Sequence, residues 1–180
     1  MNSLTFITGN MYKVTWTQRY IHLPIKHKKL DLTEIQSLDP KEVVEHKVKE
    51  AYKIIKQPVL VEDTSVVFNA WGKLPGPFIK FFLEELGNEG MSKMLTGPDR
   101  SAVARVIYGV YNGKELYFFE GAIEGTISKK PMGTNGFGWN PIFIPNGWKK
   151  TYAEMTNEEM DKVGIRRIAL EKMKKKLQTK

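Results

Sequence analysis

The sequence has no cysteine among its 180 residues, which excludes disulfides, thiolate metal sites and cysteine nucleophiles and favours a cytoplasmic protein. It also has no apolar run long enough to span a bilayer, and no basic segment followed by an apolar stretch at the N-terminus. We therefore expect neither a membrane partner nor a secretory signal. Internal repeats, low-complexity tracts and flexible linkers are absent as well. These absences, together with the length, predict one soluble globular domain over residues 1–180.

The chain carries a net charge of +8, which raises the question of a nucleic-acid partner. Five lysines lie in the last nine residues, and subtracting their charges from +8 leaves +3 for the remainder. The final predicted helix opens with the acidic segment TNEEMD and closes with these lysines, which complements the helix dipole without any partner. We therefore do not expect nucleic acid as the partner, and a phosphate- or nucleic-acid-binding tail is the alternative.

Strand and helix patterns alternate in the first half of the chain. Leu4–Ile7 predicts a buried strand, and Met11–Tyr20 predicts a helix. Asp39 and Pro40 have the character of an N-cap and a first helical residue, and apolar residues at helical spacing extend this second helix to Lys56. The apolar segment PVLVED predicts a short strand that ends in two carboxylates.

The second half begins with two short helical segments, PFIKFFLEEL and GMSKML, and then changes to strand patterns. Residues 101–128 are rich in Val, Ile, Tyr and Phe around an Asn-Gly pair, which predicts a hairpin. A Gly-rich loop precedes the short strand PIFIP, and a capping box of Thr156 and Glu159 opens one final helix. This order predicts an α/β fold with a mixed central sheet, flanking helices and two lobes around a cleft.

The segment ITGNMYK, residues 7–13, joins the first strand to the first helix. An ordinary turn needs only Gly9 for backbone freedom and Asn10 as the N-cap. A phosphate cradle needs a helix N-terminus that presents N–H groups and a cation nearby, which Lys13 would supply. The segment by itself leaves both interpretations open.

Glu62 and Asp63 end the predicted strand PVLVED and are followed by two hydroxyl residues. Such carboxylates bind Mg²⁺ through oxygen, or they orient a water and accept its proton. A polar turn whose acids cap the next element is the alternative. Lys80, in the first turn of PFIKFF, is either solvent-exposed or a counter-charge to a triphosphate. Of the two aromatic residues of NGFGWNP, we expect one to pack in the core, and the other either stacks on a purine or packs in the core as well.

These motifs together resemble the inosine triphosphate pyrophosphatase family, also called the Ham1-like family. The resemblance runs in order through ITGNMYK, LVEDTS, LPGPFIKFF, GTIS, GFGWNPIF, KTYAEM and RRIAL, over nearly the full length. It implies a long mixed sheet with two α/β lobes, and a Mg²⁺-dependent hydrolase that is usually a homodimer. The implied reaction cleaves purine nucleoside triphosphates, above all ITP, dITP and XTP, to the monophosphate and pyrophosphate.

The resemblance also implies roles for individual residues. The implied metal-binding carboxylates are Glu34 and Asp63, with Glu62 adjacent, and Asp63 is our choice of general base because it would end a rigid strand beside the metal. The implied phosphate contacts are Thr8, Gly9, Asn10, Lys13, Lys47 and Lys80. The implied base contacts are Phe137, Gly138, Trp139, Asn140 and Arg166.

The sequence departs from the family pattern at four positions. Asn140 replaces the usual Asp, and the usual EEKN..SHR segment reads EEMDKVGIR. Met160, Gly164 and Ile165 therefore replace Lys, Ser and His, whereas Arg166 is retained. Fewer polar partners for the base predict weaker discrimination between ITP and ATP. A catalytically weakened or less specific nucleotide-binding protein is the alternative function, and a nucleic-acid-binding module is a further one.

Overall fold

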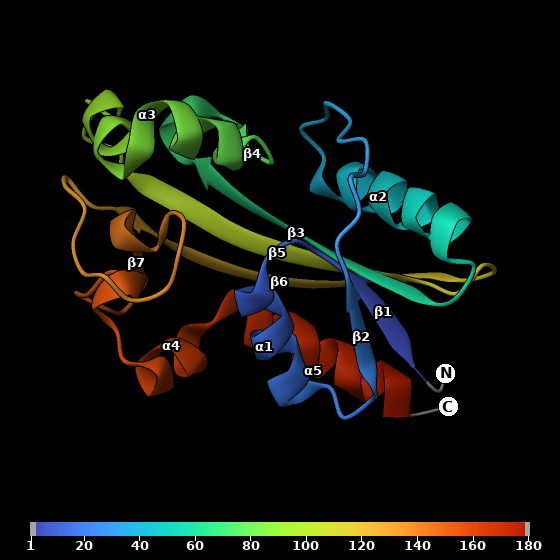
Figure 1. Cartoon of the computed structure of the whole chain (residues 1–180). Helices are drawn as coiled ribbons and strands as arrows, with labels where there is room; N and C mark the ends of the chain where they lie inside the picture. The colour runs from blue at the N-terminus through green and yellow to red at the C-terminus, as the bar shows by residue number, and fades with distance from the viewer. Residues whose placement is uncertain (1–2, 179–180) are drawn as a thin grey trace. The chain divides into compact units, whose positions relative to one another are not determined.

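The computed structural model describes residues 3–178 as a seven-stranded mixed sheet with helices packed against it (Figure 1). The strand order is β2-β1-β3-β5-β6-β7, and β4 pairs with β3. Strand β1 is parallel to β2 and β3, whereas β3–β4 and β6–β7 are antiparallel pairs. This confirms the predicted α/β fold with a mixed sheet. The strands are β1 (Leu4–Ile7), β2 (Ile25–Lys28), β3 (Val59–Phe68), β4 (Pro75–Gly76), β5 (Ser101–Tyr111), β6 (Leu116–Ile127) and β7 (Phe143–Pro145).

The helices begin largely where the capping residues predicted. Within the described range they are α1 (Met11–Tyr20), α2 (Pro40–Ile55), α3 (Ile79–Met94), α4 (Asn157–Val163) and α5 (Ile165–Gln178). Single 3₁₀ turns lie at Asn69–Trp71, Asn140–Ile142 and Tyr152–Glu154. None of the helices between residues 3 and 178 combines the length and the apolar character needed to cross a membrane.

The chain forms two compact units. The first unit comprises the described residues of Met1–Asp63, Val106–Gly121 and Arg166–Lys180, and the second comprises Thr64–Arg105 and Ala122–Ile165. The chain passes from one unit to the other within β3, β5 and β6 and at the start of α5. A cleft between two lobes stays a prediction of the sequence.

In the first unit, α2 covers one face of the strands with apolar side chains (Figure 1). The helix starts as predicted, because Asp39 Oδ1 accepts a hydrogen bond from the backbone N–H of Lys41 at 2.8 Å. It ends at Ile55, and Lys56 is its left-handed C-cap. The buried cluster under α2 brings together residues from four elements: Ile7, Val44, Val48, Ala51, Val59, Val61 and Ile107.

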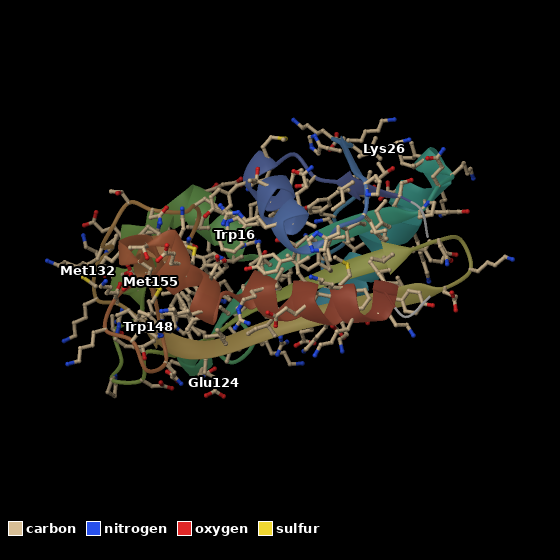
Figure 2. All side chains as sticks on the ribbon, turned by 90° about the horizontal axis from the view of Figure 1, so that it is seen from below. Trp16, Lys26, Glu124, Met132, Trp148 and Met155 are labelled. Carbon is tan, nitrogen blue, oxygen red and sulfur yellow. The ribbon has the colours of Figure 1, made fainter. Side chains whose placement is uncertain are left out.

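Helices α1 and α5 lie on the other face of the same strands (Figure 1). The bounds of β1 and α1 match the prediction, and Asn10 caps α1 by accepting from the N–H of Tyr12 at 2.9 Å. Figure 2 labels Trp16 on α1, where it is only 5% exposed, and Lys26 on β2. Since β2 pairs only with β1 among the described strands, it is an edge of the sheet.

Strand β3 does not end at the two carboxylates, as the sequence had suggested, but continues past Asp63 to Phe68. Thr64, Val66 and Val67 are β-branched and suit an extended chain. The burial of Glu62 and Asp63 within a strand is possible because cationic side chains reach both carboxylates. The strand therefore carries the carboxylates in its interior.

The Asn-Gly hairpin between β5 and β6 is confirmed. Asn112 Oδ1 accepts from the backbone N–H groups of Lys114 and Glu115 at 2.9 and 2.8 Å. The two short helical segments predicted after β4 are also confirmed. Gly87, with φ 62° and ψ 179°, forms a kink that divides α3 at their junction.

The single final helix of the prediction is in fact two helices. The capping box of Thr156 and Glu159 is confirmed at the start of α4. At Gly164 the backbone becomes extended, with ψ 122°, which interrupts the helical hydrogen-bond pattern before α5 begins. The carbonyl of Val163 instead accepts the hydroxyl of Tyr152 at 2.8 Å, so a tertiary contact satisfies the end of α4.

Candidate active site

The segment of residues 8–13 forms a tightly hydrogen-bonded loop at the start of α1. Thr8 Oγ1 accepts from the N–H of Asn10 at 3.1 Å, and the carbonyl of Asn10 accepts from the N–H of Lys13 at 3.2 Å. Gly9 is exposed, and its φ is not positive, so this turn does not require the backbone freedom of glycine. The exposed start of α1 offers backbone N–H groups and the positive end of the helix dipole, which favour an anion.

Lys13 and Arg166 share one buried carboxylate on the α1 and α5 side of β3. Lys13 Nζ lies 3.2 Å from Glu62 Oε1, and Arg166 donates from Nη2 and Nε at 2.8 and 3.2 Å. The side chain of Glu62 is 0% exposed and that of Arg166 is 12% exposed. Burial lowers the pKa of Arg166, but Glu62 outweighs this effect and raises it. The guanidinium therefore stays charged and compensates the buried carboxylate.

Two hydroxyl groups lie behind this ion cluster. Thr17 Oγ1 donates to the carbonyl of Lys13 at 2.9 Å and lies 3.3 Å from the hydroxyl of Tyr108. Both side chains are completely buried. Burial and the neighbouring Glu62 carboxylate raise the pKa of Tyr108 well above its usual value, so the phenol stays protonated. Sequence reasoning missed this pair, because no local motif links residues so far apart in the chain.

Asp63 points to the opposite face of β3, because successive side chains of a strand alternate. Lys47 on α2 bridges two carboxylates there, with Nζ 3.1 Å from Asp63 Oδ1 and 2.9 Å from Glu34 Oε1. Burial raises the pKa of Asp63, and the charges of Lys47 and Lys13 oppose that rise. Burial acts to lower the pKa of Lys47, but the two carboxylates raise it overall. The ammonium of Lys47 thus holds Glu34 and Asp63 close to each other.

The segment that carries Glu34 is fixed to α2 by a contact that the sequence did not reveal. Glu50 accepts from the backbone N–H of Thr33 at 3.0 Å and from its hydroxyl at 3.3 Å. Glu50 lies one helical turn beyond Lys47 on the same helix. Helix α2 therefore positions the Glu34 backbone and the Glu34 carboxylate together.

Asp63 and Glu34 suit a divalent cation. Asp63 Oδ2 is buried and has no hydrogen-bond partner among residues 3–178, so it has capacity for a ligand. No group of three or more His, Cys, Asp or Glu side chains in that range could hold a metal. Mg²⁺ does not need such a group, because it commonly uses one or two carboxylates and completes its shell with water and substrate phosphates. Glu62 lies on the other face of β3, and we leave it out of the metal set.

The remaining predicted residues belong to the second unit. Lys80 is exposed on α3, with its ammonium 5.8 Å from the ring centre of Phe81. Phe137 is half-buried, and the carbonyl of Gly138 accepts from the amide of Asn88 at 2.9 Å. The Gly-rich loop that contains them is tied to a later segment, because Thr151 donates to the carbonyl of Met132 at 2.8 Å and Asn135 donates to the carbonyl of Met155 at 2.9 Å. Figure 2 labels these two methionines.

Trp139 is a core residue. It is 7% exposed, and its ring centre lies 5.5 Å from that of Phe143 in an edge-to-face arrangement and 6.0 Å from that of Tyr152. The choice between stacking and core packing was open in the sequence, and the aromatic cluster explains why Trp139 takes the core position. Phe137, which is half-buried, is the more exposed of the two rings.

The four positions that depart from the family pattern are all buried. Met160 is 7% exposed, Ile165 3% and Asn140 8%, and Gly164 is buried as well. Apolar packing at Met160 and Ile165 therefore accompanies the loss of the polar side chains that the family usually carries there.

Comparison with known proteins identifies the family. A profile described as the Ham1 family matches residues 4–176. The chain belongs to the Ham1 family. This Ham1-family chain is 42% identical over 179 residues to an inosine triphosphate pyrophosphatase of Schizosaccharomyces pombe, covering 97% of this chain and 94% of the relative. It is 43% identical over 178 residues to the protein of the same name from Yarrowia lipolytica, covering 96% and 94%.

Solved structures show the same fold as this Ham1-family chain. A HAM1 protein from Coxiella burnetii superposes with a TM-score of 0.88 at 24% identity and covers 100% of both chains. The Staphylococcus aureus Ham1 protein gives a TM-score of 0.82 at 21% identity over 98% of both chains. The family and the mixed α/β fold predicted from the sequence are thus confirmed.

Proposed function

We propose that this protein is a nucleoside triphosphate pyrophosphohydrolase that cleaves ITP, dITP and XTP with the help of Mg²⁺. The relatives named inosine triphosphate pyrophosphatase support the reaction class. The observation that carries the proposal is the carboxylate pair Glu34 and Asp63, held by Lys47, with the buried oxygen Oδ2 of Asp63 left without a partner in the described chain. The two carboxylates can bind a hydrated cation, and one of them can accept a proton from a water.

The phosphate loop holds the triphosphate in this proposal. The backbone of Thr8, Gly9 and Asn10 presents the N-terminus of α1 to the phosphates, and its dipole favours their negative charge. Lys13 lies in the first turn of the helix, and its ammonium is held 3.2 Å from Glu62 Oε1. Because Glu62 is buried and also paired with Arg166, Lys13 has a restrained side chain rather than a mobile one.

Asp63 is the proposed general base. It accepts a proton from a water whose oxygen bonds to the α-phosphorus, while the bond from that phosphorus to the bridging β-phosphate oxygen breaks. Pyrophosphate leaves, and the lysines and loop N–H groups stabilise the charge that it gains. A divalent cation bound by Glu34 and Asp63 would polarise a phosphoryl oxygen and lower the pKa of a water. The raised pKa of Asp63 is suited to a base.

The remaining assignments rest on the family resemblance. Lys80 is proposed as a further phosphate contact, and the proposed base contacts are Phe137, Gly138, Trp139, Asn140 and Arg166. Among these, the burial of Trp139 favours an indirect role in which it supports the loop that carries Phe137. A homodimer is proposed on the same resemblance, and a cytoplasmic location is proposed on the absence of cysteine.

Pyrophosphate release from purified protein tests the function. Release from ITP, dITP or XTP that requires Mg²⁺ and exceeds release from ATP and GTP would support the proposal. Tight binding of these nucleotides without release would favour a weakened nucleotide-binding protein instead. Binding of DNA that persists at physiological salt would favour the nucleic-acid alternative.

We expect the preference for ITP over ATP to be smaller than that of a relative with the full polar motif. Met160, Gly164 and Ile165 supply no polar side chain for reading the 6-position of the base, and polar readout gives the largest selectivity. The measurement is the ITP to ATP ratio of kcat/KM, determined side by side with the Schizosaccharomyces pombe relative. An equal or larger ratio for this protein would show that other groups read the base.

Replacing Glu34 by glutamine is expected to raise the Mg²⁺ concentration for half-maximal activity at least several-fold. The substitution keeps the shape and removes one anionic ligand, while Asp63 remains. A Mg²⁺ titration of ITP hydrolysis measures the effect. Glu45→Gln is the matched control, since Glu45 is an α2 carboxylate that pairs only with the neighbouring Lys49 in the described contacts. An unchanged Mg²⁺ requirement in Glu34→Gln would remove Glu34 from the metal site.

A further inference from the structure

Lys29, which follows edge strand β2, lies directly against the phosphate loop. A Cβ placed on Gly9 would be 3.6 Å from both Cδ and Cε of Lys29, an ordinary van der Waals contact. The aliphatic stem of Lys29 therefore passes alongside Gly9, at the open start of α1. No motif in the sequence singled out this lysine.

The backbone around Lys29 is tied to the same loop. The carbonyl of Lys28 accepts from the N–H of Thr8 at 3.2 Å. His27 Nε2 donates to the carbonyl of Thr8 at 2.7 Å. Two hydrogen bonds from consecutive residues thus hold the end of β2 against the loop, which limits how far Lys29 moves from Gly9.

The charges of the site residues described so far cancel one another. Lys13 and Arg166 pair with Glu62, and Lys47 pairs with Glu34 and Asp63. Three cations therefore face three carboxylates, so these clusters by themselves carry no net positive charge.

Lys29 differs from these cations. It is exposed, and within residues 3–178 no carboxylate forms an ion pair with it. Its ammonium is thus available to an anion at the loop. An exposed ammonium without a carboxylate partner also binds a phosphate without breaking an ion pair in the protein.

We propose that Lys29 is a further phosphate-binding residue, whose ammonium contacts the triphosphate held at the N-terminus of α1. The inference rests on the proposed function of this loop. Lys29 supplies the positive charge that the paired cations do not, and its role is in binding, because no atom of it lies within the Glu34 and Asp63 cluster in the described contacts.

The test compares Lys29→Met with Lys28→Met in the full-length protein. Lys28 is the neighbouring residue, equally classed as exposed and of the same charge, and methionine keeps the aliphatic stem. We expect Lys29→Met to raise the KM for ITP about tenfold, the lower range for one charged hydrogen bond, with kcat changed less than about twofold. Lys28→Met should remain within about twofold in both parameters, and Lys29→Arg should recover most of the affinity.

Calorimetric binding of pyrophosphate to the same variants separates this inference from the proposed function. Weaker pyrophosphate binding in Lys29→Met alone supports the inference even if the wild-type protein hydrolyses no triphosphate. Equal losses of pyrophosphate affinity in Lys29→Met and Lys28→Met would attribute the effect to the overall positive potential of the protein. That result would overturn the inference. Unchanged KM and unchanged pyrophosphate affinity in Lys29→Met would overturn it as well.

Discussion

Replacing Asp63 by asparagine is expected to lower the turnover of ITP by about 10²–10⁴-fold, the range typical of general acid–base catalysis. Asparagine keeps the size of the side chain but does not accept the proton of a water. The Lys13 and Lys47 ammonium groups and the loop N–H donors remain, so nucleotide affinity should fall much less than turnover. Steady-state kinetics with ITP and calorimetry with a non-hydrolysable analogue measure the two quantities separately.

The matched control is Asp31→Asn, because Asp31 is an exposed carboxylate of the first unit that contacts none of the proposed site residues in the described structure. This variant should keep wild-type turnover. Near-normal turnover in Asp63→Asn would remove Asp63 from the mechanism. An equal loss of affinity and turnover would instead assign Asp63 to binding.

Replacing Arg166 by methionine is expected to destabilise the protein by about 3–5 kcal/mol, as found when one partner of a buried ion pair is removed. The side chain of Glu62 is fully buried and would lose its ion pair with Arg166, while its 3.2 Å contact with Lys13 would remain. Urea unfolding followed by circular dichroism measures the loss. Arg167→Met is the matched control, since Arg167 makes a partly exposed (i, i+4) pair with Glu171 that contributes about 0.3–0.5 kcal/mol.

The double variant Glu62→Gln with Arg166→Met tests the cause. If the loss arises from an uncompensated buried charge, neutralising Glu62 should recover part of the stability. A double variant at least as unstable as the sum of the two single variants would contradict this explanation.

The same variants test the proposed contact of Arg166 with the 6-keto oxygen of the base. A direct contact predicts that the ITP to ATP ratio of kcat/KM falls in Arg166→Met but not in Glu62→Gln. A purely supporting role predicts that kcat/KM falls for both nucleotides while the ratio stays constant. The structure supplies a reason to separate these roles, because two nitrogens of Arg166 already donate to Glu62.

Features that depend on neighbouring residues were predictable from the sequence. The N-cap of α1 at Asn10, the start of α2 at Asp39 and the hairpin turn at Asn112 all occur where predicted. Each depends on a side chain that bonds to a backbone group only two or three residues away. The ordered series of motifs likewise led to the Ham1 family, which the comparisons confirm.

Errors arose where a longer-range contact decided the local structure. The polar pair at Glu62 and Asp63 resembled a strand end, but β3 continues because Lys13, Arg166 and Lys47 compensate both buried carboxylates. The final helical pattern looked continuous, but it is divided at Gly164.

The sequence by itself therefore determined most of the elements, the N-caps of α1, α2 and α4, and the family, and it proposed the candidate site residues. Only the tertiary structure decided how those residues are grouped: Glu62 with Lys13 and Arg166, and Asp63 with Lys47. Adjacent residues of a strand point to opposite faces. Glu62 and Asp63, which look like one site in the sequence, therefore lie on opposite faces of β3. The partner of each buried charge was set by the helix that packs on its face, which no local pattern encodes.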